Sequence, residues 1–319
     1  MPALRFYDLY AADPSAVRTE LSHGLRATQA HTSPKYLYDS LGSRLFDAIT
    51  ELPEYYPTRT EFAILRQHAA EMAECIGPQA DLIEFGAGSL QKIRLLLGAL
   101  VQPARLVAID ISAEHLQAEA QRLRAEHPAL AVLALAGDFS GSLDLPAPLA
   151  GSARRVGFFP GSSIGNFTPV EAGLFLRRCA SWLSGGGLLV GVDLVKDPAL
   201  LHAAYNDSQG VTAAFNLNLL ARANRELGAD FDLTAFHHYA FYAPAEQRIE
   251  MHLVSACQQS ATVGGERFDF ADGQTLHTEN SCKYTVAGFQ ALARAAGLQP
   301  QAVWTDAQRL FSVHWLAAP

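Results

Sequence analysis

The sequence predicts a doubly wound α/β fold, in which a parallel sheet carries helices on both faces, joined to a second domain. Three observations indicate this. Short apolar runs alternate with amphipathic stretches between residues 82 and 194, and a glycine-rich loop follows the first run. The alternation stops after residue 196 and returns at residue 285. Alternation of this kind is typical of βαβ units, whose strands pair in parallel.

The individual elements follow from hydrophobic periodicity and from helix-capping residues. The strands of the sheet are expected at 82–85, 106–109, 130–136, 156–159 and 188–194, followed by two late strands at 301–305 and 311–316. Helices are expected at 61–76, 89–100, 112–126 and 285–296, with a further helix after residue 168. Ser112 is the expected N-cap of its helix, Thr168 and Glu171 have capping-box spacing, and Gly297 is an expected C-cap.

Composition narrows the class of protein. Hydrophobic residues make up 49% and charged residues 18% of the chain, which is enough for a large core, and the formal net charge of −8 argues against nucleic acid as a partner. The four cysteines are scattered without a Cys-x-x-Cys pair, so we expect neither disulfides nor a zinc cage. The apolar stretches are too short to span a bilayer and the start of the chain lacks a signal-peptide pattern, so we expect a cytoplasmic protein without membrane contact.

The loop after the first strand, Glu84 to Ser89, leads into a helix N-terminus, where backbone N–H groups can approach a ligand. Apart from a plain structural turn, two functions are possible for this loop: binding of a dinucleotide and binding of a methyltransferase cofactor. A dinucleotide fingerprint needs a third glycine three residues after Gly88, but Gln91 stands there, so an NAD-dependent dehydrogenase is disfavoured. The acidic residue before Gly86 and Gly88 instead resembles the opening of the cofactor loop in class I methyltransferases.

Carboxylates follow the next two strands. Asp110 ends the second strand and is placed to accept hydrogen bonds from ribose hydroxyls, although a helix N-cap is the alternative. Asp138 and Phe139 end the third strand, where they suit an adenine, although a loop acid beside a core aromatic is the alternative. Ligands of open α/β sheets bind at the carboxyl ends of the strands, so the joint occurrence of these residues indicates a cofactor site.

Five longer motifs carry a resemblance to a known family. They lie at residues 33–47, 52–59, 159–167, 193–197 and 279–283. In this order, from about residue 20 to the C-terminus, the chain closely resembles the ergothioneine-pathway L-histidine Nα-methyltransferases. The resemblance implies a class I, Rossmann-like methyltransferase domain (61–196 with 285–319) that binds S-adenosylmethionine. It also implies a substrate-binding domain, built from 1–60 with the insertion 197–284, and trimethylation of the histidine α-amino group to hercynine.

The resemblance also implies roles for single residues. The cofactor-binding residues would be Gly86, Gly88 and Lys92 at the methionine end, Asp110 at the ribose, and Asp138 with Phe139 at the adenine. In the substrate site, Tyr38, Phe46 and Tyr55 would line the reaction chamber. The substrate carboxylate would be held by Asn166 and Tyr205, and its amine would lie near Gly161 and Ser163. The imidazole would pack beside Met251, and its nitrogens would hydrogen-bond with Glu279 and Ser281. Family members often carry Thr where this chain has Ser163, which leaves the detailed contact of that residue open.

The chemistry fits these residue types. Methyl transfer from a sulfonium needs a neutral amine aligned with the S–CH3 bond, and a phenol such as Tyr38 or Tyr55 can relay the released proton or orient the amine. Packing is the alternative role of both phenols. Glu279 and Ser281, two residues apart in an extended segment, would face one imidazole together, while Asn280 would point away.

Other functions remain as alternatives. They are methylation of another aromatic amino acid such as tryptophan, and a cofactor-binding module without turnover. The adjacent pair His237 and His238 invites a metal, but neighbouring residues of a strand face opposite ways, so packing or exposure is preferred and no metal is expected. The expected partner is a small amino acid, and we expect a monomer.

Overall fold

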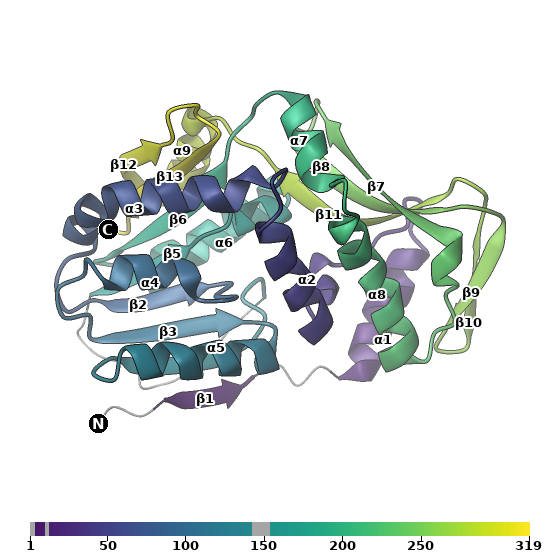
Figure 1. Ribbon diagram of the computed structural model, residues 1–319, viewed down its shortest axis with the longest axis horizontal. Helices are drawn as coiled ribbons and strands as arrows, with labels where there is room; N and C mark the ends of the chain where they lie inside the picture. Colours follow the sequence, from purple (N-terminus) through teal and green to yellow (C-terminus); the bar gives the residue numbers. More distant parts are fainter. Residues whose placement is uncertain (1–3, 10–12, 142–153) are drawn as a thin grey trace. The chain divides into compact units, whose positions relative to one another are not determined.

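An eight-stranded sheet organises the first of two units in the computed structural model, which describes residues 4–9, 13–141 and 154–319 (Figure 1). This unit comprises Met1–Tyr10, Pro57–Val195 and Cys282–Pro319, and the second comprises Ala11–Tyr56 and Lys196–Ser281. In spatial order the strands of the large sheet are β1 (Arg5–Asp8), β4 (Ala131–Ala136), β3 (Arg105–Asp110), β2 (Asp81–Phe85), β5 (Arg155–Phe159), β6 (Gly187–Asp193), β13 (Phe311–Ala317) and β12 (Gln299–Thr305).

The pairing confirms the doubly wound prediction. Neighbouring strands from β1 to β6 are parallel, whereas β13 is antiparallel to β6 and to β12. The strand β1 was not predicted, because its short, half-buried sequence lacks a clear period-two pattern. It pairs with β4 and extends the sheet by one strand.

Helices cover both faces of this sheet (Figure 1). One apolar core is formed by one set of strand residues together with α3 (Tyr56–Ile76), α4 (Gln91–Leu97) and α5 (Ala113–Glu126). A second core is formed by the alternate set of strand residues together with α6 (Pro169–Trp182) and α9 (Val286–Ala295). In β2, for example, Leu82 belongs to the first core and Ile83 to the second. Such alternation is the period-two geometry of a strand buried on both faces.

Two local predictions were wrong and two were confirmed. The helix expected from residue 89 begins at Gln91, because Leu90 before it has left-handed dihedral angles (φ 55°). Ser112 occupies the N-cap position, but within the described helix its hydroxyl makes no capping bond, and its own N–H donates to Asp110. Thr168 and Glu171 form the predicted capping box. Gly297, with φ 93°, follows the last turn of α9 as predicted.

The second unit joins helices to small antiparallel sheets. Its elements are α1 (Pro14–Leu25), η1 (Pro34–Leu37), α2 (Ser40–Thr50), α7 (Pro198–Tyr205), α8 (Val211–Leu227), η4 (Leu233–Ala235), a three-stranded sheet in the order β11 (Thr275–Cys282), β8 (Arg248–Ser255), β7 (Phe236–Ala243), and the pair β9 (Gln259–Val263) and β10 (Glu266–Phe270). Asp39 joins its two sequence segments, because this carboxylate caps α2 through the N–H of Gly42 and also accepts from Asn218 and Arg225 of α8.

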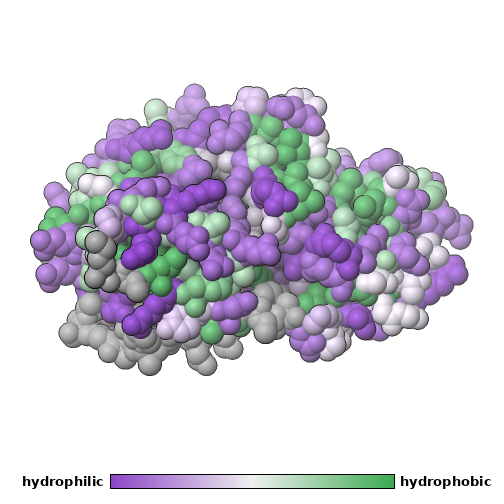
Figure 2. All heavy atoms as spheres, turned by 60° about the horizontal axis from the view of Figure 1, so that its bottom comes forward, coloured by the Kyte–Doolittle hydropathy of each residue, from purple (hydrophilic) through white to green (hydrophobic). Residues whose placement is uncertain are grey.

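The surface drawn in Figure 2 is largely hydrophilic. On the face drawn in Figure 2, hydrophilic side chains spread between small, separate groups of hydrophobic ones. Among the described helices, none combines the length and the apolar character that crossing a membrane requires. All four cysteines lie within the described residues and are free thiols.

A buried ion pair fixes the point where the chain returns to the large sheet after the insertion. Lys283 Nζ lies 2.7 Å from Asp193 Oδ2, and the two side chains are 0% and 1% exposed. Beside them, the Tyr284 N–H donates to the Asp193 carbonyl at 3.1 Å, and the Val195 N–H donates to the Tyr284 carbonyl at 3.0 Å. The returning segment is therefore attached to the end of β6 by charge and by backbone pairing.

We expect Lys283→Met to lower the free energy of unfolding by about 3–5 kcal/mol, because removing one partner leaves the buried Asp193 charge uncompensated. Urea denaturation followed by circular dichroism measures this loss. The matched control is Arg267→Ala, which breaks a pair with Asp269 whose side chains are 71% and 74% exposed, and its effect should stay below about 1 kcal/mol. Equal effects of the two substitutions would contradict the assignment.

Candidate active site

Polar loops of the first unit gather at the carboxyl edge of the parallel strands. The strand β2 pairs with β3 on one side and with β5 on the other, so the winding of the chain reverses at this strand. The loops after β2, β3, β4 and β5 all leave the sheet at the same edge because their strands are parallel. This is the position where open α/β sheets bind ligands.

The loop after β2 has an open, strained backbone suited to close approach. Gly86 has φ 66°, and a side chain there would meet the Phe139 ring at 3.7 Å and Ser163 Oγ at 3.9 Å. The left-handed dihedral angle favours glycine, and the missing side chain leaves room in front of Phe139. The predicted cofactor loop therefore has the backbone that its sequence indicated.

Asp110 ties this loop to the end of β3. Its Oδ2 accepts the N–H of Gly88 at 2.9 Å, and its Oδ1 accepts the N–H of Ser112 at 2.9 Å. Each carboxylate oxygen keeps lone-pair capacity for hydroxyl donors of a ligand. Burial raises the pKa of Asp110, although the two backbone hydrogen bonds oppose this shift.

Phe139, expected at an adenine, has a second role in the core. Its half-buried ring lies 5.5 Å from Phe159 and 6.2 Å from Phe85, both edge to face. Next to it, Asp138 accepts the N–H of Ser140 at 2.8 Å. Phe139 is thus held rigidly by core aromatics while it faces the space before Gly86.

A buried carboxylate that the sequence analysis missed lies beneath these loops. Glu61 of α3 is 0% exposed, and its Oε2 lies 2.7 Å from Lys92 Nζ. The same carboxylate accepts the N–H of Gly161 at 2.9 and 3.1 Å. A side chain on Gly191 of β6 would come within 2.1 Å of Glu61 Oε1, so the glycine makes room for the carboxylate. Its position on the apolar stripe of α3, three residues before Ile64, was the available signal.

Acidic charge exceeds basic charge in this region. Glu84 is 1% exposed, and its Oε2 has no hydrogen-bond partner among the described atoms. Burial raises the pKa of Glu84 well above its usual value; Lys92 opposes this shift, whereas Asp110 and Glu61 add to it. The Lys92 ammonium therefore acts on two carboxyl groups, through its ion pair with Glu61 and through its effect on the pKa of Glu84.

Aromatic side chains of the second unit form a connected group. The ring of Phe46 lies 5.7 Å from that of Tyr38 and 6.3 Å from that of Tyr55, and Tyr55 lies 6.3 Å from Tyr205. Phe215 of α8, which the sequence analysis did not single out, packs against Tyr38 at 5.4 Å and Phe46 at 6.0 Å. Three predicted chamber residues are thus neighbours, and Phe215 holds two of them.

The predicted imidazole contacts lie on two strands of the same unit. Met251 of β8 is buried, as are Glu279 and Ser281 of β11, while Asn280 between them is half-buried. The Tyr205 hydroxyl donates to Ser281 Oγ at 2.6 Å, which links a predicted carboxylate-binding residue directly to a predicted imidazole-binding one. His238 contacts the Tyr205 carbonyl at 2.8 Å and His237 is exposed, so packing and exposure describe this pair as expected.

The predicted site residues divide between the two units. The first unit contains Gly86, Gly88, Lys92, Asp110, Asp138, Phe139, Gly161, Ser163 and Asn166, and the second contains Tyr38, Phe46, Tyr55, Tyr205, Met251, Glu279 and Ser281. Ser163 and Asn166 begin and end the short helix η3 (Ser163–Asn166), and Ser163 Oγ donates to the Pro160 carbonyl at 3.1 Å. That the two groups serve one reaction stays a prediction.

Comparison with known proteins identifies the family. A family model described as "Histidine-specific methyltransferase, SAM-dependent" matches residues 17–318. The histidine N-alpha-methyltransferase of Mycolicibacterium smegmatis is 43% identical over 304 residues, covering 93% of this chain and 94% of that protein. The protein of the same name from Mycobacterium tuberculosis is 44% identical over 299 residues, covering 91% of each chain. Ergothioneine biosynthesis protein 1 of Neurospora crassa is 34% identical over 303 residues, covering 88% of this chain and 32% of that protein.

These matches extend over both units and include all the loops at the carboxyl edge of the sheet. The chain belongs to the family of histidine-specific, S-adenosylmethionine-dependent methyltransferases.

Proposed function

We propose that this enzyme methylates the α-amino group of L-histidine with S-adenosylmethionine, up to three times, to give hercynine in ergothioneine biosynthesis. We further propose that it acts as a monomer in the cytoplasm on the free amino acid. The observation that carries the substrate assignment is Glu279, a carboxylate only 7% exposed on a strand beside Met251. A buried carboxylate of this kind can accept a hydrogen bond from an N–H donor, and an imidazole supplies one.

The residues of the first unit fit the cofactor. S-adenosylmethionine carries a sulfonium and an ammonium charge, and the carboxyl groups of Glu61 and Asp110, which both act electrostatically on Glu84, suit a cation. The unpartnered Glu84 Oε2 and the open space before Gly86 are two further features that a bound molecule would satisfy. When bound, the cofactor supplies an electrophilic methyl group on sulfur, and Asp110 is suited to accept hydrogen bonds from the ribose.

Positioning supplies most of the catalysis in this proposal. A neutral amine attacks the methyl carbon in line with the breaking C–S bond, and the nitrogen then releases a proton to regain its lone pair for the next transfer. Alignment of the reacting groups lowers the barrier by up to about 7–11 kcal/mol, so no strong base is required. Tyr38 and Tyr55, each packed against Phe46, are the phenols proposed to orient the amine or pass the proton to water.

Substrate selectivity rests on Glu279 and Ser281 in this proposal. A protonated imidazole offers two N–H donors and a neutral one offers one, and a carboxylate accepts from either form. The Tyr205 hydroxyl donates to Ser281, which fixes the direction of the serine hydroxyl. An amino acid without a ring N–H could not donate this hydrogen bond to Glu279, and such a mismatch disfavours a substrate.

Glu279→Ala should raise the KM for histidine roughly 10- to 100-fold, because a hydrogen bond to a charged group contributes about 1.5–3 kcal/mol. Mass spectrometry of methylated products from histidine and from tryptophan measures both the loss and any change of preference. The control is Asp272→Ala, an exposed acidic residue in the turn before β11. Unchanged KM in Glu279→Ala would refute the imidazole contact, and absence of all methylated histidines from wild-type enzyme would refute the proposed function.

Glu61→Gln should weaken the binding of S-adenosylhomocysteine at least roughly tenfold, because it removes the charge that holds Lys92 and faces the Gly161 N–H. Isothermal titration calorimetry measures the affinity, and circular dichroism verifies the fold. The matched control is Glu74→Gln, because Glu74 lies on the same helix and its side chain is exposed. This variant should bind S-adenosylhomocysteine as the wild type does. Wild-type affinity in a folded Glu61→Gln variant would show that Glu61 does not position the cofactor loops.

Acidification should weaken S-adenosylhomocysteine binding at a higher pH than an ordinary aspartate would predict. Burial raises the pKa of Asp110 in the folded protein, so its carboxylate is complete above that raised pKa and is lost as the pH falls through it. The raised pKa also means that protonation of Asp110 favours the folded state over the unfolded one as the pH falls. Calorimetric titrations from pH 8 to pH 5 measure the binding.

Two variants separate the two buried carboxyl groups whose pKa is raised, Asp110 and Glu84. Asp110→Asn should bind more weakly at pH 8 and lose the acidic decline, whereas Glu84→Gln should keep it. An acidic decline that persists unchanged in Asp110→Asn would assign the titration to another group.

A further inference from the structure

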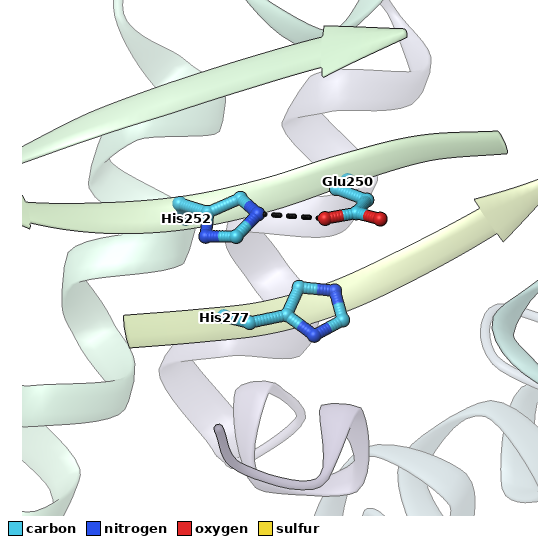
Figure 3. A group of neighbouring side chains, drawn as sticks. All are labelled: Glu250, His252 and His277. Carbon is cyan, nitrogen blue, oxygen red and sulfur yellow. Dashed lines mark hydrogen bonds and ion pairs between the residues drawn. The ribbon is translucent and has the colours of Figure 1, made fainter. Parts of the chain in front are cut away.

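Three potential metal ligands, none of them among the residues proposed for catalysis, converge in the second unit. Glu250 and His252 are two residues apart on β8 and therefore lie on the same face of this strand, and His277 lies on the neighbouring strand β11 (Figure 3). One ligand atom from each of the three side chains lies within 4.8 Å of the other two. Figure 3 shows the His277 ring facing the hydrogen-bonded pair of Glu250 and His252.

We propose that Glu250, His252 and His277 bind one divalent transition-metal ion of the Zn²⁺ class. Two imidazoles and one carboxylate form a common set of protein ligands for zinc, and the fourth position is left for water. Bond lengths of about 2.0–2.1 Å in a tetrahedral site separate neighbouring ligand atoms by about 3.3 Å. His252 Nε2 and Glu250 Oε2 are 3.0 Å apart, so this pair has the spacing already, and small side-chain rotations bring in His277.

The carboxylate of Glu250 is oriented for this role. Its Oε1 accepts from Arg248 at 2.5 and 2.8 Å, which leaves Oε2 directed at His252. Outer hydrogen bonds of this kind hold the ligands of metal sites in place. Because the arginine also opposes a cation, we expect an affinity below that of structural zinc cages.

Burial keeps the two imidazoles in their metal-binding form. The side chain of His252 is 5% exposed, and loss of water lowers its pKa. The same cause lowers the pKa of His277 to about 4. Burial thus favours the neutral form of both rings, which has the lone pair that a metal ion needs.

The position of the cluster suggests what the ion does. Met251 lies between two of the ligands on β8, and the Thr278 hydroxyl donates to its carbonyl at 3.0 Å. His277 Nε2 contacts the backbone carbonyl of Glu279 at 3.1 Å. An ion bound here would cross-link β8 and β11, the strands that carry Met251 and Glu279. This consequence for histidine recognition rests on the proposed function, whereas metal binding itself does not.

Cobalt titration of the full-length, tag-free chain tests the site, because Co²⁺ replaces Zn²⁺ and absorbs visible light in low-coordinate nitrogen and oxygen sites. After chelator treatment and without histidine, which binds metals itself, we expect saturation at about one equivalent and loss of the absorption when Zn²⁺ is added. Zn²⁺ at about 100 times its Kd should raise the melting temperature by roughly 5–10 °C.

Variants locate the ion. His252→Ala and His277→Gln should abolish the absorption and the thermal shift, and Glu250→Gln should weaken both. The control His237→Ala changes an exposed histidine of β7 in the same sheet and should keep them. Circular dichroism and urea denaturation verify that each variant is folded.

Two results would overturn the proposal. The first is the absence of saturable binding by the wild-type chain, and the second is equal binding by wild type and His277→Gln. The three residues would then belong only to the ring stack in which His252 lies 5.3 Å from Phe241 and 4.9 Å from His277. Neither result depends on turnover, so failure of this site and failure of histidine methylation can be told apart.

Discussion

Parallel pairing on both sides of β2 is the constraint on which the cofactor half of the molecule depends. Because β3, β2 and β5 point the same way, the chain must leave each of them at one edge, and the residues that follow are forced together however far apart they are in sequence. Gly86, Asp110 and Gly161 reach this edge from three different crossovers. Hydrogen bonds then fix the loops to one another, since the Asp110 carboxylate accepts the Gly88 N–H.

Buried charge gives this edge its chemical character. Glu61, 0% exposed, is compensated by the Lys92 ammonium and by the Gly161 N–H, so its desolvation cost is offset only while both partners stay in place. Glu84 Oε2 has no hydrogen-bond partner among the described atoms, and burial raises the pKa of Glu84. The neighbouring carboxyl groups of Asp110 and Glu61 raise this pKa further, whereas the half-buried Lys92 lowers it.

Local sequence patterns predicted helices and strands correctly where a single pattern determined the element. The capping box of Thr168 with Glu171 and the strand β2 were confirmed, because side-chain spacing alone determines the first and a continuous apolar run the second. Ser112 occupies the predicted N-cap position, but its hydroxyl makes no capping bond; the side-chain contact there is local and comes from Asp110, which accepts the Ser112 N–H. The edge strand β1 was missed because a strand of four residues is stabilised by its partner β4 more than by its own pattern.

In the candidate site, too, local sequence patterns predicted only part of the residues. Residues inside long motifs, such as Tyr55 and Glu279, were named from the family resemblance, whereas their chemistry alone would have left Glu279 a surface charge. Glu61 and Phe215 were missed because their roles come from partners distant in sequence. The group of Glu250, His252 and His277 was missed for the same reason, since spacing along the chain does not reveal that β8 and β11 are neighbours.

The pairing of β6 with β13 has a consequence for the order of folding during synthesis. The strand β6 ends at Asp193, but its antiparallel partner begins only at Phe311, after the whole insertion and α9. While a ribosome makes the intervening residues, one side of β6 presents unpaired N–H and C=O groups of an apolar strand, a template for pairing with other chains. Completion of the large sheet thus waits until β13 has been translated, and a product truncated before β13 would leave that side of β6 exposed.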